Sequence, residues 1–223
     1  MRMIKALIFD FDGLILDTES PEVDVWMAIY AEYGFQFPFD NWVQTLGGYG
    51  ISNFDAAEHL SLLSQGRLDS ASMRSRHRSG SEALTLKKPV MTGVTDYIHE
   101  AKRLGLKLAI ASSSQHDWVD THAKRLGIFE YFDKVVCSDD VGPGRTKPNP
   151  DLFLLALSQL QVQKNEAIVF EDSPNGIKAA NRAGIFAVAV PNSITSRLNI
   201  IYADMILNSL SDLSLPELLN KVQ

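Results

Sequence analysis

The chain has 223 residues, of which 45% are hydrophobic and 22% are charged, and its formal net charge is −6. This length allows one large domain, or a domain with a smaller partner, and the composition is that of an ordinary globular protein. A chain with net negative charge lacks the strongly basic face that non-specific nucleic-acid binding needs, so we expect no nucleic-acid partner. The single cysteine, Cys137, cannot form an internal disulfide, and its apolar neighbours predict a buried thiol.

The apolar runs are too short for insertion into a membrane. The first run follows Arg2 and Lys5 and is interrupted at Asp10, which is too early for the apolar segment of a secretory signal. No other stretch approaches the roughly 18 residues of a membrane span. We therefore expect a cytoplasmic protein without a membrane partner.

The first predicted element is a strand over IKALIF, residues 4–9, and a helical region follows it. Within residues 17–90 the aromatic side chains Trp26, Tyr30 and Tyr33 recur at helical spacing, and SNFDAAEHLSLL repeats that pattern. We find no convincing strand in this region. The pattern predicts a helical insert placed directly after the first strand, with these aromatic residues in its core.

The remaining chain alternates short apolar runs with helix-like segments. The runs are LKLAIA, KVVC, AIVF, FAVAV and DMIL, and the helix-like segments are DYIHEAKRLG, DWVDTHAKRLG, PDLFLLALSQL and NGIKAANRAG. Three of the four segments end in Gly, which is favoured just past a helix C-terminus. The alternation predicts an α/β fold, a Rossmann-like three-layer core with a parallel sheet between helices. We expect residues 1–16 and 91–223 to form this core and residues 17–90 to form a helical cap domain.

Polar side chains follow four of the predicted strands. They are Asp10, Asp12 and Gly13 after IKALIF, Ser112, Ser113 and Ser114 after LKLAIA, Lys147 in GPGRTKPNP after KVVC, and Glu171 and Asp172 after AIVF. Ligands of open parallel sheets bind at the carboxyl ends of the strands, so these groups should meet at one edge. Alone, each has an ordinary interpretation as a helix cap or a solvated loop. Their conjunction favours a functional site.

The residue types at this edge suit phosphoryl chemistry. The carboxylates of Asp10, Asp12, Glu171 and Asp172 are hard oxygen donors, which suit Mg²⁺. A lysine and hydroxyl donors opposite a metal form a pocket for a phosphoryl group. Carboxylates also serve as phosphoryl acceptors, and a second carboxylate can act as general acid and base. The residues alone do not decide which aspartate attacks.

At these positions the sequence resembles the haloacid dehalogenase superfamily, in its phosphatase branch, over nearly the whole chain. The family's D-x-D-G motif appears as DFDG from Asp10 to Gly13, and its Ser or Thr after a strand appears as Ser112. Its Lys-Pro motif appears as Lys147-Pro148, and its acidic motif appears as Glu171-Asp172. The insert resembles the helical cap of the subfamily that includes β-phosphoglucomutase and many sugar-phosphate phosphatases.

The resemblance implies a role for each motif residue. Asp10 would be the nucleophile that forms an aspartyl phosphate, and Asp12 would be the general acid and base. Mg²⁺ would be held by Asp10, the Asp12 backbone carbonyl and Asp172, with Glu171 near it. Ser112, Ser113 and Lys147 would bind the phosphoryl oxygens. The implied activity is Mg²⁺-dependent hydrolysis of a small phosphorylated metabolite, and we expect a sugar or polyol phosphate.

Two other interpretations stay open, a phosphosugar mutase and a non-catalytic phosphometabolite-binding relative. β-Phosphoglucomutases show a histidine in the first cap helix, where this chain has Glu22, and an arginine after the cap glycine, where LGGYGISN has no basic residue. Hydrolysis is therefore the favoured interpretation. An acid at Asp12 also argues against a dehalogenase, which does not need one there.

Three expectations concern the cap and the assembly. The basic run MRSRHRSG, which includes Arg74, Arg76 and Arg78, predicts a solvated helix face more than a second anion site. The glycine-rich turn at Gly47, Gly48 and Gly50 is the candidate for a substrate-facing loop. We expect a monomer, since such a cap shields the site without a second subunit.

Overall fold

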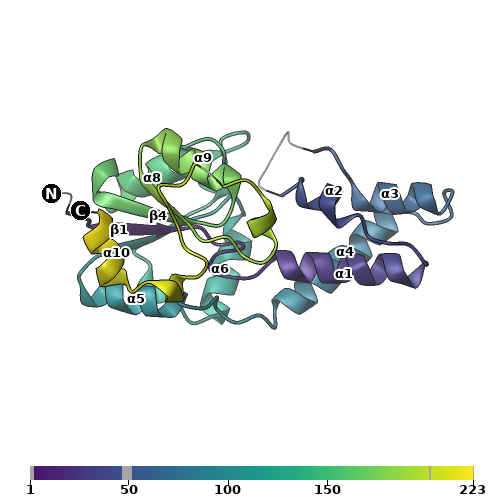
Figure 1. Ribbon diagram of the computed structural model, residues 1–223, viewed down its shortest axis with the longest axis horizontal. Coiled ribbons are helices and arrows are strands. Elements are labelled where there is room, and N and C mark those ends of the chain that lie inside the picture. The colour runs from purple at the N-terminus through teal and green to yellow at the C-terminus, as the bar shows by residue number, and fades with distance from the viewer. Residues whose placement is uncertain (1–2, 47–51, 201, 223) are drawn as a thin grey trace.

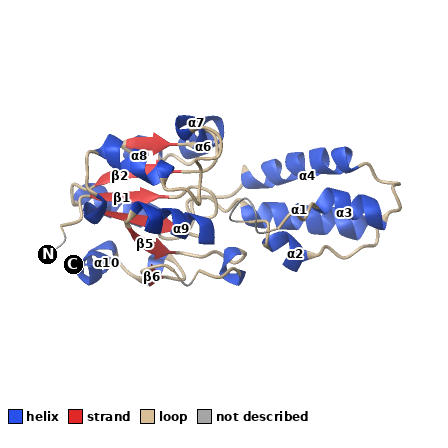
Figure 2. Cartoon of the chain, turned by 90° about the horizontal axis from the view of Figure 1, so that it is seen from above, coloured by secondary structure: helices blue, strands red, loops and turns tan. Residues whose placement is uncertain are grey.

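A six-stranded parallel sheet forms the centre of the molecule in the computed structural model, which describes residues 3–46, 52–200 and 202–222. The strand order is β3-β2-β1-β4-β5-β6, so the order reverses between β1 and β4 (Figures 1 and 2). The strands are β1 Ala6–Phe9, β2 Lys107–Ala111, β3 Lys134–Val136, β4 Ala167–Glu171, β5 Phe186–Ala189 and β6 Met205–Ile206.

Each of the predicted runs overlaps one of these strands. The predicted helices are also present, each with bounds shifted by a few residues at most. The α-helices of the described chain are α1 Glu19–Glu32, α2 Phe39–Val43, α3 Ala56–Leu63, α4 Ser70–Thr85, α5 Val94–Arg103, α6 His116–Arg125, α7 Ser138–Val141, α8 Asp151–Leu160, α9 Pro174–Ala183 and α10 Leu215–Val222. The α/β prediction is confirmed.

Successive residues of β1 face opposite layers, because side chains alternate along a strand. Leu7 and Phe9 belong to the apolar cluster formed with α5, α6 and α10, whereas Ala6 and Ile8 belong to the cluster formed with α8 and α9. Helices therefore cover both faces of the sheet. Cys137 is fully buried in the first cluster, as predicted.

Helices α1–α4 form a separate helical unit beyond the carboxyl edge of the sheet (Figures 1 and 2). Its apolar cluster centres on α1, where Trp26 and Tyr30 are buried against Phe37 and Leu60. Tyr30 also donates its hydroxyl hydrogen to the Ala56 backbone oxygen at 2.7 Å. The prediction for Tyr33 is wrong, because this residue follows the last turn of α1 and its side chain points outward at 36% exposure.

The two segments that join the helical unit to the sheet lie side by side. Met91 N donates to Ile15 O at 2.9 Å, and the Lys88 ammonium lies 2.7 Å from an Asp17 carboxylate oxygen. Because all chain crossings between the two parts occur here, we propose for the folded protein the division into residues 1–16 with 91–223 and residues 17–90. In the text below, the latter part is the helical insert.

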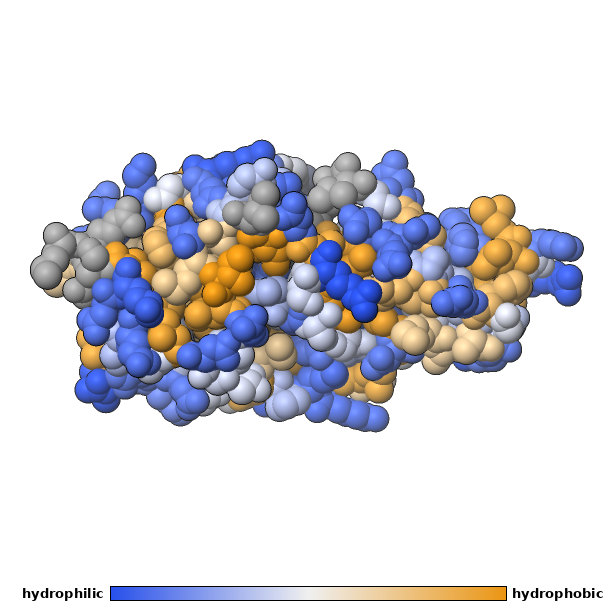
Figure 3. All heavy atoms as spheres, in the orientation of Figure 1, coloured by the Kyte–Doolittle hydropathy of each residue, from blue (hydrophilic) through white to orange (hydrophobic). Residues whose placement is uncertain are grey.

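The surface mixes charged and apolar residues. Figure 3 shows hydrophilic spheres interspersed with hydrophobic ones across the face in view. Among the described helices, none combines the length and the apolar character needed to cross a membrane.

Candidate active site

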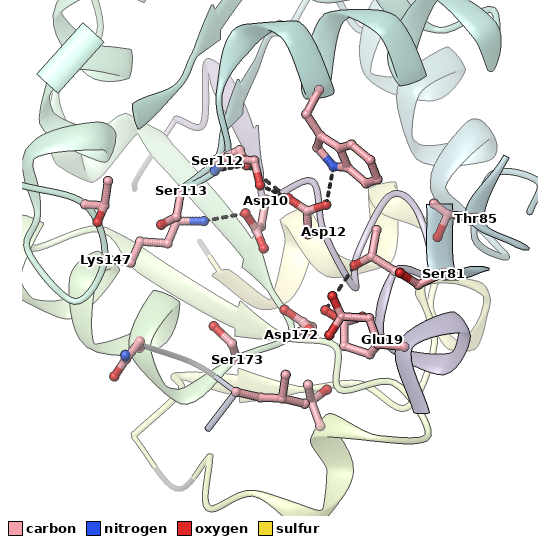
Figure 4. Close-up of a pocket in the computed structure, with 18 of the residues that line it drawn as sticks. Asp10, Asp12, Glu19, Ser81, Thr85, Ser112, Ser113, Lys147, Asp172 and Ser173 are labelled. Atoms are coloured by element: carbon pink, nitrogen blue, oxygen red, sulfur yellow. Dashed lines mark hydrogen bonds and ion pairs between the residues drawn. The ribbon is translucent and has the colours of Figure 1, made fainter. Parts of the chain in front are cut away.

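The four strand ends meet at one edge of the sheet, where the helical insert begins (Figure 4). They line a cavity of about 580 Å³. Its walls come from the core and from the insert: Asp10, Asp12, Thr18, Glu19, Glu22, Leu46, Arg78, Ser81, Glu82, Thr85, Ser112, Ser113, Ser114, Trp118, Thr146, Lys147, Asp172, Ser173, Asn175 and Thr195. All predicted site residues except Glu171 line this cavity, and Glu171 lies directly behind it.

Three carboxylates converge where the strand order reverses, which is where ligands of open α/β sheets bind. β1 and β4 are neighbours, and Asp10 N donates to Phe170 O at 3.0 Å, so Asp10 lies beside the end of β4. One oxygen each from Asp10, Glu171 and Asp172 can be chosen such that all lie within 4.8 Å of one another. All three residues are buried. Hard oxygen donors this close together suit a divalent cation such as Mg²⁺.

Lys147 neutralises part of this cluster. Its ammonium contacts Asp10 Oδ1 and lies 2.6 Å from Glu171 Oε1, and its side chain is 6% exposed. The second Glu171 oxygen accepts hydrogen bonds from Ser173, from the backbone N at 3.1 Å and from Oγ at 3.0 Å. Glu171 therefore holds Lys147 against Asp10 from a fully buried position.

The electrostatics of the cluster favour added positive charge. Burial raises the pKa of Asp10 to about 7; the Glu171 charge adds to this, and Lys147 opposes it. Burial, followed by the charges of Glu19 and Glu171, raises the pKa of Asp172 well above its ordinary value. For Lys147, burial disfavours the ammonium, but the Asp10 and Glu171 carboxylates outweigh burial and raise its pKa. One lysine thus leaves the carboxylate cluster short of cationic charge.

Two glycines permit this close packing. Gly13 has φ +80°, and a Cβ there would lie 2.2 Å from Asp172 Oδ2. A Cβ on Gly176, in the first turn of α9, would lie 1.8 Å from the Glu171 carboxyl carbon. Both distances are far below van der Waals contact, so a side chain at either position would displace a carboxylate.

Asp12 points away from the carboxylate cluster, toward the segment after β2 (Figure 4). Its Oδ1 accepts a hydrogen bond from Trp118 Nε1 at 2.8 Å, and its Oδ2 accepts one from Ser114 Oγ at 2.6 Å. Ser112 Oγ lies at 3.3 Å from the same Oδ2 and also accepts the Ser114 backbone N–H at 3.0 Å. Asp10 and Asp12 therefore occupy different environments, although they are two residues apart.

The first turn of α1 brings two carboxyl groups from the insert to the cavity. Burial, with the Asp12 charge adding to it, raises the pKa of Glu19 to about 8 and that of Glu22 to about 7. Glu19 Oε1 accepts the Thr18 hydroxyl hydrogen at 3.1 Å. The sequence interpretation used Glu22 only to judge the mutase and did not identify Glu19. The signal that could have identified Glu19 is the acidic stretch DTESPE, residues 17–22, at the start of the predicted insert.

The arginines of the basic run on α4 have different partners, as their helical spacing predicts. Arg74 forms salt bridges with Asp55 at 2.9 Å and with Glu58 of α3. Arg76 forms a salt bridge with Glu32. Arg78 is exposed, as the solvated-face interpretation predicts, and it also lines the cavity. Arg78 and Lys147 are the two basic side chains among the described lining residues. The candidate loop at Gly47, Gly48 and Gly50 lies outside the described residues.

Comparisons with known proteins identify the family of this chain. A family model described as haloacid dehalogenase-like hydrolase matches residues 7–190. The chain is 40% identical to the protein YhcW of Bacillus subtilis strain 168 over 218 residues, 98% of this chain and 97% of that one. It is 31% identical to the fructose-1-phosphate phosphatase YqaB of Escherichia coli K12 over 187 residues, 83% of this chain and 95% of that one.

The fold also matches a solved structure with bound ligand. CbbY from Rhodobacter sphaeroides in complex with xylulose 1,5-bisphosphate superposes with a TM-score of 0.71 and 27% identity, covering 97% of this chain and 99% of that one. The chain belongs to the haloacid dehalogenase-like hydrolase family. Within that family it is a phosphoric monoester hydrolase of the phosphatase branch.

Proposed function

We propose that the protein is a Mg²⁺-dependent phosphatase that hydrolyses a small phosphorylated metabolite through an aspartyl phosphate on Asp10. The observation that carries this proposal is the placement of Asp10 between Lys147 and the Asp172 carboxylate, at the floor of the cavity. A carboxylate held beside a lysine and a metal site faces an incoming phosphoryl group from a fixed direction.

Asp10, Glu171 and Asp172 fit a divalent cation because they are buried oxygen donors, and because burial and neighbouring carboxylates raise the pKa values of Asp10 and Asp172. We propose that Asp10, Asp172 and the Asp12 backbone carbonyl would hold Mg²⁺, with Glu171 beside it. When bound, the ion would supply positive charge that screens the approach of a phosphate dianion to the carboxylates.

In the first chemical step an Asp10 carboxylate oxygen attacks phosphorus, and the bond from phosphorus to the ester oxygen breaks. The departing alkoxide takes a proton from the Asp12 carboxyl group. In the second step the Asp12 carboxylate removes a proton from water as the water oxygen attacks phosphorus. The bond from phosphorus to Asp10 then breaks, which releases inorganic phosphate and restores both residues.

Ser112, Ser113 and Lys147 are the proposed ligands of the phosphoryl oxygens. Lys147 already contacts the Asp10 carboxylate, so it is within reach of a group transferred to Asp10. Ser112 Oγ donates to Asp12 and accepts the Ser114 N–H, so its hydroxyl hydrogen would turn from Asp12 to a phosphoryl oxygen. Ser113 lies on the cavity wall beside it.

The insert side of the cavity supports a hydroxyl-rich leaving group. Ser81, Glu82 and Thr85 of α4 line it together with Glu22 and Arg78. These side chains offer hydrogen-bond donors and acceptors to a polyol, and one cation to an acidic group. Because YqaB acts on fructose 1-phosphate, by its name, we propose sugar and polyol phosphates as the substrate class.

A phosphate-release screen tests the function. Fructose 1-phosphate, glycerol 3-phosphate and p-nitrophenyl phosphate would be incubated with the protein in MgCl₂ or in EDTA. We expect release with MgCl₂ that EDTA abolishes, and no release from Asp10→Asn with its fold intact by circular dichroism. Release by Asp10→Asn at the wild-type rate would contradict the nucleophile assignment. No release from any phosphate ester would favour the non-catalytic alternative.

The mutase alternative has its own test. Glu22 lines the cavity and stands where β-phosphoglucomutases show a histidine, and a carboxyl group, unlike an imidazolium, carries no positive charge in either protonation state. We therefore expect β-glucose 1-phosphate, given with its bisphosphate activator, to yield phosphate. Glucose 6-phosphate without phosphate release would establish the mutase. We also propose a cytoplasmic monomer, because the helical insert covers the cavity within one chain.

A further inference from the structure

Asn192 lies just beyond β5 and contacts three segments of the site. Its side-chain Nδ2 donates to Asp172 Oδ2 at 3.0 Å and to the Gly13 backbone oxygen at 3.1 Å. The same nitrogen lies 3.3 Å from Glu19 Oε2. One amide group thus joins the end of β4, the turn after β1 and the first residue of α1. None of the steps proposed above uses Asn192.

The orientation of this amide is fixed by its own loop. Asn192 Oδ1 accepts the backbone N–H groups of Ile194 at 2.9 Å and of Thr195 at 3.0 Å. Asn192 N in turn donates to Thr195 Oγ1 at 3.0 Å. A flipped amide would direct its NH₂ group at two N–H donors, so only the orientation with Nδ2 toward Asp172 places donors opposite acceptors on both sides of the amide.

The opposite side of the same loop, residues 192–198, contacts the helical insert. Ile194 and Leu198 pack against the apolar cluster of the insert, and the Arg197 guanidinium lies 4.8 Å from the centre of the Phe39 ring. The loop is therefore held on two sides. Asn192 binds the carboxylate cluster on one side, and apolar side chains contact α1 and α2 on the other.

We propose that Asn192 is a positioning residue that holds the Asp172 carboxylate in its metal-binding orientation and joins it to Glu19 at the start of the insert. Asp172 and Glu19 repel each other as carboxylates, and a shared donor between them offsets part of that repulsion. Hydrogen-bond partners of metal ligands typically change metal affinity by about 10–100-fold when removed. The proposal rests on the metal site proposed above.

Isothermal titration calorimetry with MgCl₂, without substrate, tests this role directly. Asn192→Ala removes both the donor and the loop acceptor. Asn192→Ser keeps an oxygen that can accept the loop N–H groups, as serine does in comparable turns, but cannot reach Asp172. We expect both variants to bind Mg²⁺ about 10–100-fold more weakly than the wild type. Asn181→Ala is the matched control, because Asn181 is exposed and its Nδ2 donates to Tyr202 O, away from the cavity.

A second variant separates the two sides of the loop. Ile194→Ala removes an apolar contact with the insert and leaves the Asn192 amide in place. We expect Ile194→Ala to keep wild-type affinity for Mg²⁺ in calorimetry and to raise KM for the best substrate of the screen. Equal weakening of Mg²⁺ binding by Ile194→Ala and Asn192→Ser would contradict a specific role of the amide.

The outcomes distinguish this inference from the proposed function. If the wild type shows no Mg²⁺ binding heat and no Mg²⁺-dependent activity, the metal site itself is wrong. If the wild type binds Mg²⁺ and Asn192→Ser binds it within about threefold of the same affinity, the positioning role alone is overturned. Circular dichroism and a thermal scan of each variant show whether it is folded, and Asn192→Ser is the decisive variant if Asn192→Ala is not.

Discussion

Replacing Lys147 with methionine should destabilise the metal-free protein strongly. Methionine has a similar length but no charge, so the Asp10 and Glu171 carboxylates would lose the ammonium that contacts both. Removing one partner of a buried ion pair typically costs about 3–5 kcal/mol, because a buried charge is left uncompensated. For a chain of this size that loss corresponds to a decrease in Tm of roughly 6–20 °C.

The assay is urea or thermal unfolding in EDTA at about pH 8, which lies above the raised pKa of about 7 of Asp10. Lys102→Met is the matched control, because Lys102 pairs with Asp133 at 3.0 Å and the two side chains are 35% and 42% exposed. An exposed pair contributes about 0–1 kcal/mol. At about pH 5 the effect of Lys147→Met should shrink, since protonation removes the uncompensated charge. A Lys147→Met loss equal to that of Lys102→Met at both pH values would refute this reasoning.

Three further results follow from the burial of the site and the core. In EDTA, the Tm of the wild type should fall as pH rises from about 5 to about 8. Asp10 and Glu22 both have a pKa raised to about 7, so over this range the folded state binds protons that the unfolded chain has released. A Tm that rises across this range would contradict the prediction. Burial raises the pKa of the Cys137 thiol to about 12, so a thiol reagent at neutral pH should label Cys137 only after denaturation, and rapid labelling of the folded protein would contradict that burial. Gly176→Ala should lower the free energy of unfolding by about 1–3 kcal/mol and reduce Mg²⁺ affinity, because its Cβ would displace the Glu171 carboxyl group. Unfolding curves that match those of the wild type would contradict this, because they would show that the site accommodates the methyl group without cost.

Much of the core could be predicted because its strands are short, apolar and alternate with helices. Parallel strands share one carboxyl edge, so Asp10, Ser112, Lys147 and Asp172 had to converge once the sheet was parallel. The structure adds the strand order, with β1 beside β4, and this order brings Asp10 next to Asp172. The alternation of strands and helices in the sequence does not predict that β1 and β4 are neighbours.

The residues that the sequence did not identify depend on tertiary contacts. Asn192 follows FAVAV as directly as Asp172 follows AIVF, but only the pairing of β4 with β5 brings it to Asp172. Trp118 lies in the first turn of α6, and its contact with Asp12 depends on the direction of that helix. Arg78 was one of several arginines on α4, and helical spacing alone did not reveal which of them faces the cavity.

The aspartyl phosphate on Asp10 is the central claim, and chemical trapping tests it most directly. Enzyme turning over the best phosphate ester in MgCl₂ would be quenched and reduced with borohydride, which converts an acyl phosphate of aspartate to homoserine. Peptide mass spectrometry should then find homoserine at Asp10 and unchanged aspartate at Asp12, with no conversion when substrate is omitted. Homoserine at Asp12, or none at either position during rapid phosphate release, would contradict the account.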